Sequence, residues 1–198
     1  MVTRFAIAAE TERAHLYEPK PLDGVTIEAV ESYPNPRNNE AGLGIGLYPF
    51  NPYYTATLIN FNYLFNISRI MQWEILNANY AYTFDKGITT ELADRFGVNP
   101  KVIDRLQFMI SSNVLFSHSN GKFVFRGDNI RYFRSSAITG LGLVNTSQRS
   151  NIVVNIGVRF EVFTGDTFAW RFDIRDSLAP TDSFTQYVSF TLGSAFSF

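Results

Sequence analysis

The fold is decided by residues 151–162, which read Asn-Ile-Val-Val-Asn-Ile-Gly-Val-Arg-Phe-Glu-Val. Every even-numbered position from Ile152 to Val162 is apolar, whereas most odd-numbered positions are small, amide or charged. Residues 59–67 repeat the pattern, with apolar side chains alternating mainly with asparagine. Successive side chains of a β-strand point to opposite faces, so each segment predicts a strand with one apolar and one polar face.

The same alternation recurs along the chain after Glu40 and predicts eight strands. They are expected at residues 41–51, 54–66, 72–84, 106–118, 131–145, 150–163, 168–178 and 185–198. Most connections are short; the exceptions are residues 85–105, within which 89–96 predict a short helix, and a smaller excursion at 119–130. Residues 1–40 hold six of the nine glutamates and little periodicity, so we expect a polar, partly extended N-terminal arm over 1–40 and a β-domain over 41–198.

Composition excludes several classes of protein. Charged residues supply 18% of the chain, against about 25% in an ordinary soluble domain. The mean hydropathy of −0.05 nevertheless excludes a bundle of transmembrane helices. A net charge of −1 with no basic run argues against a nucleic-acid partner. No apolar stretch of signal-peptide length lies in residues 1–20, so for an exported protein we expect the signal to have been removed.

No helical pattern is long enough to cover a sheet, so the strands must form a sandwich or a closed barrel. Alternation alone does not separate a soluble barrel with an apolar interior, such as a lipocalin, from a membrane barrel with an apolar exterior. Lysine, which keeps exposed strands soluble, is expected only outside the strands, at Lys20, Lys86, Lys101 and Lys122. The polar faces combine small residues with charges of both signs, which suits a narrow lumen in which every charge needs a partner.

The chain ends on Thr191-x-Gly193-x-x-Phe196-x-Phe198. This pattern resembles the C-terminal signal of bacterial outer-membrane β-barrels, which the barrel assembly machinery recognises. Together with the even strand count, it favours a closed eight-stranded antiparallel transmembrane β-barrel in the bacterial outer membrane. Residues near the strand ends are expected to form the aromatic girdles: Tyr53, Tyr54, Trp73, Tyr82, Phe84, Phe168, Trp170 and Phe198.

Three short motifs occur in a fixed order: Glu18-Pro19-Lys20-Pro21-Leu22, Gly121-Lys122-Phe123 and Arg171-Phe172-Asp173-Ile174-Arg175-Asp176. Their order is similar to that of the outer-membrane β-barrel domain family of myxobacteria and related delta-proteobacteria, small barrels resembling OmpA. The resemblance covers most of residues 15–198, although residues 24–36 depart from the family pattern. It implies the fold and the outer-membrane location, and it implies no activity.

Charged residues on the predicted strands form a candidate lumen network. Its members are Arg134, Arg159, Glu161, Arg171, Asp173 and Arg175. One interpretation is a gate for ions or protons; the interpretation we favour is a structural network of ion pairs, because an eight-stranded barrel is just filled by its side chains.

With both termini in the periplasm, residues 85–105 become the longest extracellular loop. Its apolar residues predict a short amphipathic segment that either closes the barrel mouth as a lid or binds a partner: Leu92, Phe96, Val98, Val102 and Ile103. The partners we expect are outer-membrane lipid and lipopolysaccharide, the assembly machinery and an envelope protein.

No catalytic constellation is evident. Ser117 and His118 are adjacent on one strand and point to opposite faces, so they do not form a nucleophile–base pair. Two histidines and no cysteine predict no transition-metal site, and no cofactor is expected. The favoured function is therefore a non-enzymatic outer-membrane scaffold that binds partners. A small pore or conduit for ions, solutes or lipid is the alternative, and an outer-membrane lipid-modifying enzyme is a remote one.

Overall fold

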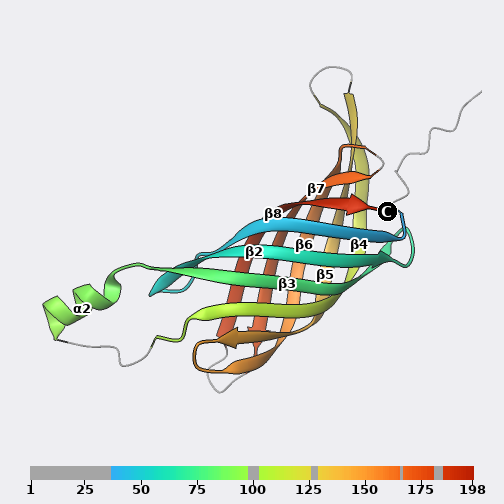
Figure 1. Ribbon diagram of the computed structural model, residues 1–198. Helices are drawn as coiled ribbons and strands as arrows, with labels where there is room; N and C mark the ends of the chain where they lie inside the picture. Colours follow the sequence, from blue (N-terminus) through green and yellow to red (C-terminus); the bar gives the residue numbers. More distant parts are fainter. Residues whose placement is uncertain (1–36, 98–102, 126–128, 166, 181–184) are drawn as a thin grey trace, which may run out of the picture. The chain divides into compact units, whose positions relative to one another are not determined.

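The described part of the chain, in a computed structural model, covers residues 37–97, 103–125, 129–165, 167–180 and 185–198. Eight strands form a closed antiparallel barrel, in which each strand pairs with the next and β8 pairs with β1 (Figure 1). The strands are β1 (Asn39–Tyr48), β2 (Tyr54–Asn66), β3 (Met71–Asp85), β4 (Leu106–Phe125), β5 (Asn129–Thr146), β6 (Ser150–Phe163), β7 (Phe168–Ala179) and β8 (Thr185–Ser197). The fold class predicted from the alternation is confirmed.

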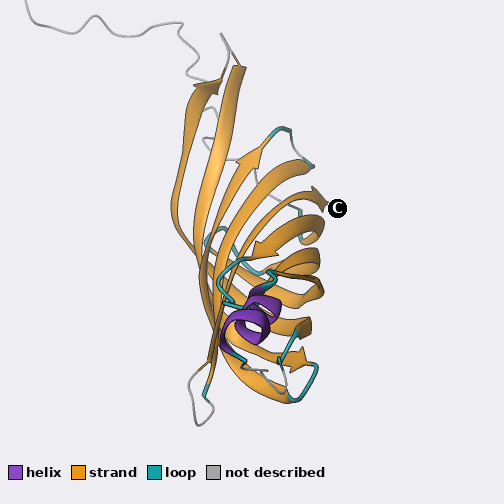
Figure 2. Cartoon of the chain, turned by 90° about the vertical axis from the view of Figure 1, so that its left-hand side faces the viewer, coloured by secondary structure: helices purple, strands orange, loops and turns teal. Residues whose placement is uncertain are grey.

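The barrel has two ends, which we name by what they carry. The terminus end is where β1 begins and β8 finishes, and it also carries the β2–β3, β4–β5 and β6–β7 connections. The loop end carries the remaining connections, including helix α2 (Ile88–Phe96), which is purple in Figure 2 and lies beyond the end of β3 in Figure 1. None of the described helices is both long and apolar enough to cross a membrane.

The outer face of the barrel is apolar, whereas much of its interior is polar and charged, the reverse of a soluble protein. Leu43, Ile45 and Tyr80 on the outer face expose 63%, 66% and 61% of their surface. Arg159 and Glu161, in contrast, point inward and are fully buried, with 0% exposed. Burying charged side chains while exposing large apolar ones is unfavourable in water, so this surface is suited to lipid.

The β4–β5 hairpin is longer than the sequence pattern predicted. The excursion expected at 119–130 is wrong for its described residues, because the strand ladder continues from Ser119–Ser135 to Phe125–Asn129. The register shifts between Ser117 and Ser119, and this bulge interrupts the alternation on which the prediction relied.

The end of this hairpin stands clear of its neighbours. β3 last pairs with β4 at Met71–Phe116, and β6 last pairs with β5 at Tyr132–Phe163. Residues 117–125 of β4 therefore have no partner in β3, and residues 129–131 of β5 have none in β6. Together they form the β4–β5 extension at the terminus end, visible in Figure 1 as the yellow hairpin that projects beyond its neighbours. Lys122 lies on it, so the prediction that all lysines lie outside the strands is wrong at this position; its side chain is exposed, as solubility requires.

β1 begins two residues before the predicted limit. Asn39 and Glu40, assigned to the polar arm, pair with Phe65 and Leu64 of β2 and belong to the barrel. Residues 1–36 of the predicted arm lie outside the described residues.

Glycines allow β1 and β8 to close the barrel. Gly44 and Gly193 are directly paired across the closure. A Cβ atom on Gly193 would lie 2.5 Å from the Leu43 carbonyl oxygen and 2.9 Å from Gly44 Cα. These are backbone atoms of the pairing strand and do not move independently, so the closure requires glycine at this position.

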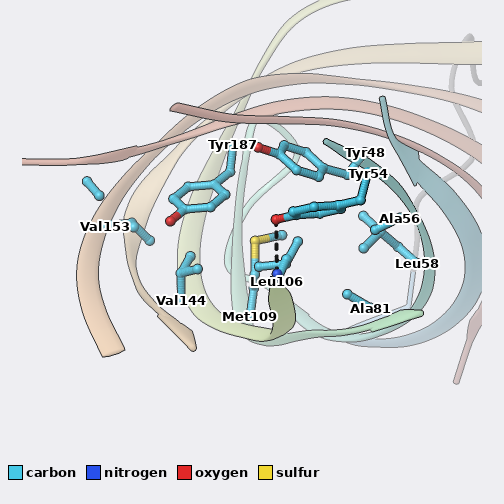
Figure 3. Packing of buried hydrophobic residues seen from close by; sticks show 11 residues of the cluster. Tyr48, Tyr54, Ala56, Leu58, Ala81, Leu106, Met109, Val144, Val153 and Tyr187 are labelled. Carbon is cyan, nitrogen blue, oxygen red and sulfur yellow. Dashed lines mark hydrogen bonds between the residues drawn. The ribbon is translucent and has the colours of Figure 1, made fainter. Parts of the chain in front are cut away.

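An apolar cluster fills the lumen near the loop end, with three tyrosines at its centre (Figure 3). The rings of Tyr54 and Tyr187 lie 6.1 Å and 5.9 Å from that of Tyr48, and the Tyr54 hydroxyl accepts a hydrogen bond of 3.0 Å from the Leu106 amide. Tyr54 is 1% exposed, so the prediction that it belongs to an outer aromatic girdle is wrong. Residue parity explains the error, because Tyr54 shares the inward face of β2 with Ala56 and Leu58.

Candidate functional site: the ion-pair networks of the lumen

Charged side chains cross the lumen in two groups, each containing two arginines and two carboxylates. The group nearer the terminus end, the terminus-side network, consists of Glu40, Arg134, Glu161 and Arg171. The central network consists of Glu74, Arg159, Asp173 and Arg175. Two charges of each sign make each group neutral, as a buried cluster requires.

In the terminus-side network, Glu161 of β6 receives hydrogen bonds from both arginines. Arg134 Nε and Arg171 Nε lie 2.5 Å and 2.6 Å from its two carboxylate oxygens. Arg171 also pairs with Glu40 and donates to Asn62 Oδ1 over 2.8 Å. The arginine of β7 thereby ties together β1, β2 and β6.

The central network is more densely bonded. Arg159 binds Asp173 through two nitrogens, each over 2.8 Å, and reaches Glu74 over 2.8 Å. Arg175 donates to the two oxygens of Glu74 over 2.7 Å and 2.9 Å, and to Asp173 over 2.7 Å. Pairs in which two guanidinium nitrogens meet a carboxylate are the strongest and most directional ion pairs in proteins.

A chain of asparagine side chains joins the two networks. From Asn62, which accepts from Arg171, it continues through Asn60, Asn79 and Asn77 with hydrogen bonds of 2.9 Å, 2.8 Å and 2.7 Å. Asn77 then donates to Glu74 Oε1 over 3.4 Å. The charged and amide side chains of the lumen therefore form one connected polar network.

Little space remains between these side chains. One cavity, bordered by Asn77 and Arg175, measures ≈ 10 Å³, and a second, bordered by Asn62 and Arg171, also measures ≈ 10 Å³. A volume of this size holds about one water molecule. Toward the loop end, the tyrosine-centred cluster adds a layer of buried apolar side chains.

All six charged residues predicted for the lumen are buried there, and the structure brings them together. Two further members of the networks, Glu40 and Glu74, were not predicted from the sequence. A signal for them existed, because four predicted arginines against two predicted carboxylates leave a charge of 4 − 2 = +2 in a buried space. Two further carboxylates were therefore needed, and the alternation of residues 72–84 placed Glu74 on the polar face.

The residues of the C-terminal pattern divide between the two faces of β8. Thr191 and Gly193 face the lumen, whereas Phe196 and Phe198 expose 59% and 56% of their surface. The last residue still takes part in closure, since the Phe198 amide donates to the Asn39 carbonyl over 2.9 Å.

The predicted partner loop is described only in part. Leu92 and Phe96 lie on α2, where Phe96 is 70% exposed, whereas Ile103 packs against the apolar cluster of the lumen. Val98 and Val102 lie outside the described residues.

His118 has a serine partner that its sequence neighbours did not reveal. Its Nε2 atom lies 3.2 Å from Ser135 Oγ on β5, at an exposed position of the outer face. Among the described residues no carboxylate is bonded to His118, so the third group that orients a catalytic base is not present there. Nor does the described part of the chain contain a group of three or more acidic or histidine residues suited to a metal ion.

No protein-family model and no curated protein match the chain, so its resemblance to the myxobacterial family stays a hypothesis. Among solved structures, it is similar to the N-terminal β-barrel domain of Pseudomonas aeruginosa OprF, with 9% identity, a TM-score of 0.48, and coverage of 83% of this chain and 100% of that one. The outer membrane protein Ail of Yersinia pestis in a phospholipid bilayer nanodisc gives 13% identity, a TM-score of 0.42, and coverage of 81% and 98%. Neisserial surface protein A gives 9% identity, a TM-score of 0.39, and coverage of 81% of this chain and 94% of that one. Because these TM-scores are low, the fold assignment rests on the strand pairing of the chain itself.

Proposed function

We propose that the chain is a non-enzymatic outer-membrane β-barrel with a closed lumen, which serves as a scaffold for partners in the envelope of a Gram-negative bacterium. The observation that carries the proposal is the combination of an apolar outer face with buried, mutually neutralising charges inside. Only lipid makes this arrangement favourable, and only a closed barrel leaves no unpaired strand edge in lipid.

A scaffold is favoured over a pore by the contents of the lumen. Ions need a continuous polar path, yet the ion-pair networks leave cavities of ≈ 10 Å³ and the apolar cluster lies in series with them. The elements that extend from the barrel are the β4–β5 extension at one end and α2 at the other, and each offers exposed side chains to a partner. In this proposal the C-terminal pattern meets the assembly machinery, lipid and lipopolysaccharide surround the barrel, and the myxobacterial family remains the relationship we favour.

Planar-bilayer recording tests the closed lumen. We expect purified protein, shown to be folded by its heat-modifiable migration, to give no steady unitary currents. The double variant Tyr48→Ala and Tyr187→Ala, which opens the apolar cluster alone, should also stay silent because the ion-pair networks remain. Steady currents from the unaltered protein would contradict the scaffold and favour the pore.

A search for the partner tests the other half of the proposal. We expect an envelope protein that co-purifies with the barrel to be lost when either the β4–β5 extension or residues 86–105 are removed. Retention of every co-purifying protein by both deletion variants would contradict a partner-binding role for these two elements.

A further inference from the structure

The β4–β5 extension creates a groove on the outer face of the barrel at the terminus end. Its volume is ≈ 400 Å³, and its lining residues come from four consecutive strands and the β6–β7 connection: Phe123, Arg131, Val162, Thr164 and Trp170. Phe123 is the strand partner of Arg131, and Val162 is that of Trp170. The groove exists because β4 and β5 continue past the end of β6, so that the extension forms a wall above the shorter strands.

One cationic side chain stands among these apolar ones. Arg131 is half-buried, and its Nη1 nitrogen donates to the Thr164 carbonyl over 2.6 Å, which holds the guanidinium at the groove. A guanidinium carries five N–H donors, and Arg131 forms no other hydrogen bond among the described residues. Several donors are therefore available to an anionic group.

The charge of this end favours the same kind of ligand. The described basic residues at the terminus end, outside the lumen, are Arg37, Arg69, Lys122 and Arg131. The described carboxylates outside the lumen lie at the loop end or toward it: Asp85, Glu91, Asp94, Asp104 and Asp176. Among the described residues outside the lumen, this end therefore carries basic side chains and no acidic ones, and Arg131 is the basic side chain that lines the groove on the outer face.

We propose that this groove binds an anionic glycerophospholipid, with Arg131 holding the phosphate and Trp170, Phe123 and Val162 packing against an acyl chain. A planar guanidinium matches the geometry of a phosphate, and aromatic side chains at the membrane boundary suit the adjoining glycerol and chain. The inference rests on the proposed membrane location, in which the terminus end faces the periplasm and its leaflet consists of phospholipid.

The two tryptophans of the chain provide a matched pair of reporters. Trp73 and Trp170 are each the third residue of a strand that starts at the terminus end, and both point outward, with 44% and 52% of their surface exposed. They therefore lie at a similar depth, but only Trp170 lines the groove. Trp73→Phe leaves Trp170 as the single reporter, and Trp170→Phe leaves Trp73.

Each single-tryptophan protein is placed in nanodiscs that contain brominated phosphatidylglycerol or brominated phosphatidylcholine in an unbrominated phosphatidylcholine bilayer. We expect the quenching of Trp170 to show about a fivefold preference for phosphatidylglycerol, the effect of one basic side chain near a membrane surface. Trp73 should show no preference. Arg131→Gln should abolish the preference at Trp170, whereas Lys122→Gln, on the opposite face of the same extension, should retain it.

Each other outcome overturns the inference in a recognisable way. Equal quenching of Trp170 by both lipids, or equal loss of preference in Arg131→Gln and Lys122→Gln, excludes a specific site at the groove. If neither tryptophan is quenched by either lipid, the outer face is not in the membrane, and the proposed function fails first. If Arg131→Gln does not fold, the same quenching measurement is made at high salt on the single-Trp170 protein that retains Arg131. A preference for phosphatidylglycerol that persists at high salt contradicts the role of the charge.

Discussion

Arg171 illustrates how a single residue can join several strands of this barrel. Its guanidinium pairs with Glu40 of β1 and Glu161 of β6 and donates to Asn62 of β2, and it is 3% exposed. These partners come from three different strands, and each supplies an oxygen that accepts a hydrogen bond from the planar guanidinium group of Arg171. A buried charge with such partners is costly to leave unpaired, and that cost determines what a substitution does.

Replacing Arg171 with alanine should therefore lower the free energy of unfolding by about 3–5 kcal/mol, because it leaves a net negative charge on the buried Glu40 and Glu161. Urea titration in detergent micelles, followed by tryptophan fluorescence, measures the change.

Arg95 on α2 supplies the control, since it pairs with Glu91 over 3.2 Å but both side chains are more than half exposed. Arg95→Ala should change the free energy of unfolding by less than about 1 kcal/mol. Similar losses in the two variants would contradict a special role for the buried pair.

Gly193 belongs to the C-terminal pattern and also to the closure of the barrel, and substitution separates the two roles. Gly193→Ala would bring a Cβ atom within 2.5 Å of the Leu43 carbonyl oxygen. We expect it to lower the free energy of unfolding by about 1–3 kcal/mol and to slow refolding in detergent, where no assembly machinery is present.

Gly165→Ala is the matched control, because a Cβ atom at Gly165 meets nothing within 4 Å. Phe198→Ala should refold normally in detergent and be defective only in cells if its role is recognition. Normal refolding of Gly193→Ala would show that packing at the closure tolerates a methyl group.

At the scale of elements, the β4–β5 extension behaves as an addition to the barrel. β4 has no β3 partner beyond Phe116, and β5 has no β6 partner before Tyr132. The described residues of 123–131 pair only with one another, so removing this segment breaks no ladder of the closed sheet. The bulge between Ser117 and Ser119 reverses which residues of β4 face each side of the sheet. Beyond it, a Cβ atom on Gly121 would lie 2.8 Å from the ring of Phe133, so glycine makes room for this ring.

Deleting residues 123–131 and joining Lys122 to Tyr132 through Asn-Gly should leave the barrel folded. An Asn-Gly pair forms the tight turn that suits a two-residue hairpin. Heat-modifiable migration should persist and the urea midpoint should change little, whereas the phosphatidylglycerol preference at Trp170 should disappear. Loss of folding would show that the extension is part of the structural core.

For the whole molecule, the closed ring explains why the composition is poor in charge and near neutral in mean hydropathy. One face of every strand meets lipid and the other meets the lumen, so the two contributions cancel. Side chains fill the lumen, where they form two neutral ion-pair networks and an apolar layer.

The closed and filled barrel should unfold only on heating in sodium dodecyl sulfate. We expect unheated protein to migrate faster than boiled protein on an electrophoresis gel, because the folded barrel is more compact and binds less detergent. Identical migration before and after boiling, or a soluble monomer without detergent, would contradict a membrane barrel.

Much of this structure follows from the sequence by itself. The period of two along residues 59–67 and 151–162 determines strand faces locally, since each side chain must point to one side or the other. The number of strands and the division of their residues between two faces follow from that parity. The composition of the polar face, the scarcity of lysine and the C-terminal pattern then predicted that the polar face, with its six charges, lines the lumen. A bulge interrupts the alternation, so the sequence pattern did not predict that β4 continues past Ser117.

Other features were decided only by the tertiary structure. Whether Tyr54 lies in an outer girdle or an inner cluster depends on which face of β2 closes inward at the loop end. Glu40 became a lumen residue because the closure of β1 on β8 extends the ladder into the predicted arm. Alternation is a property of neighbouring residues, whereas pairing partners such as Glu40 and Arg171 are set by ring closure, which no local pattern contains.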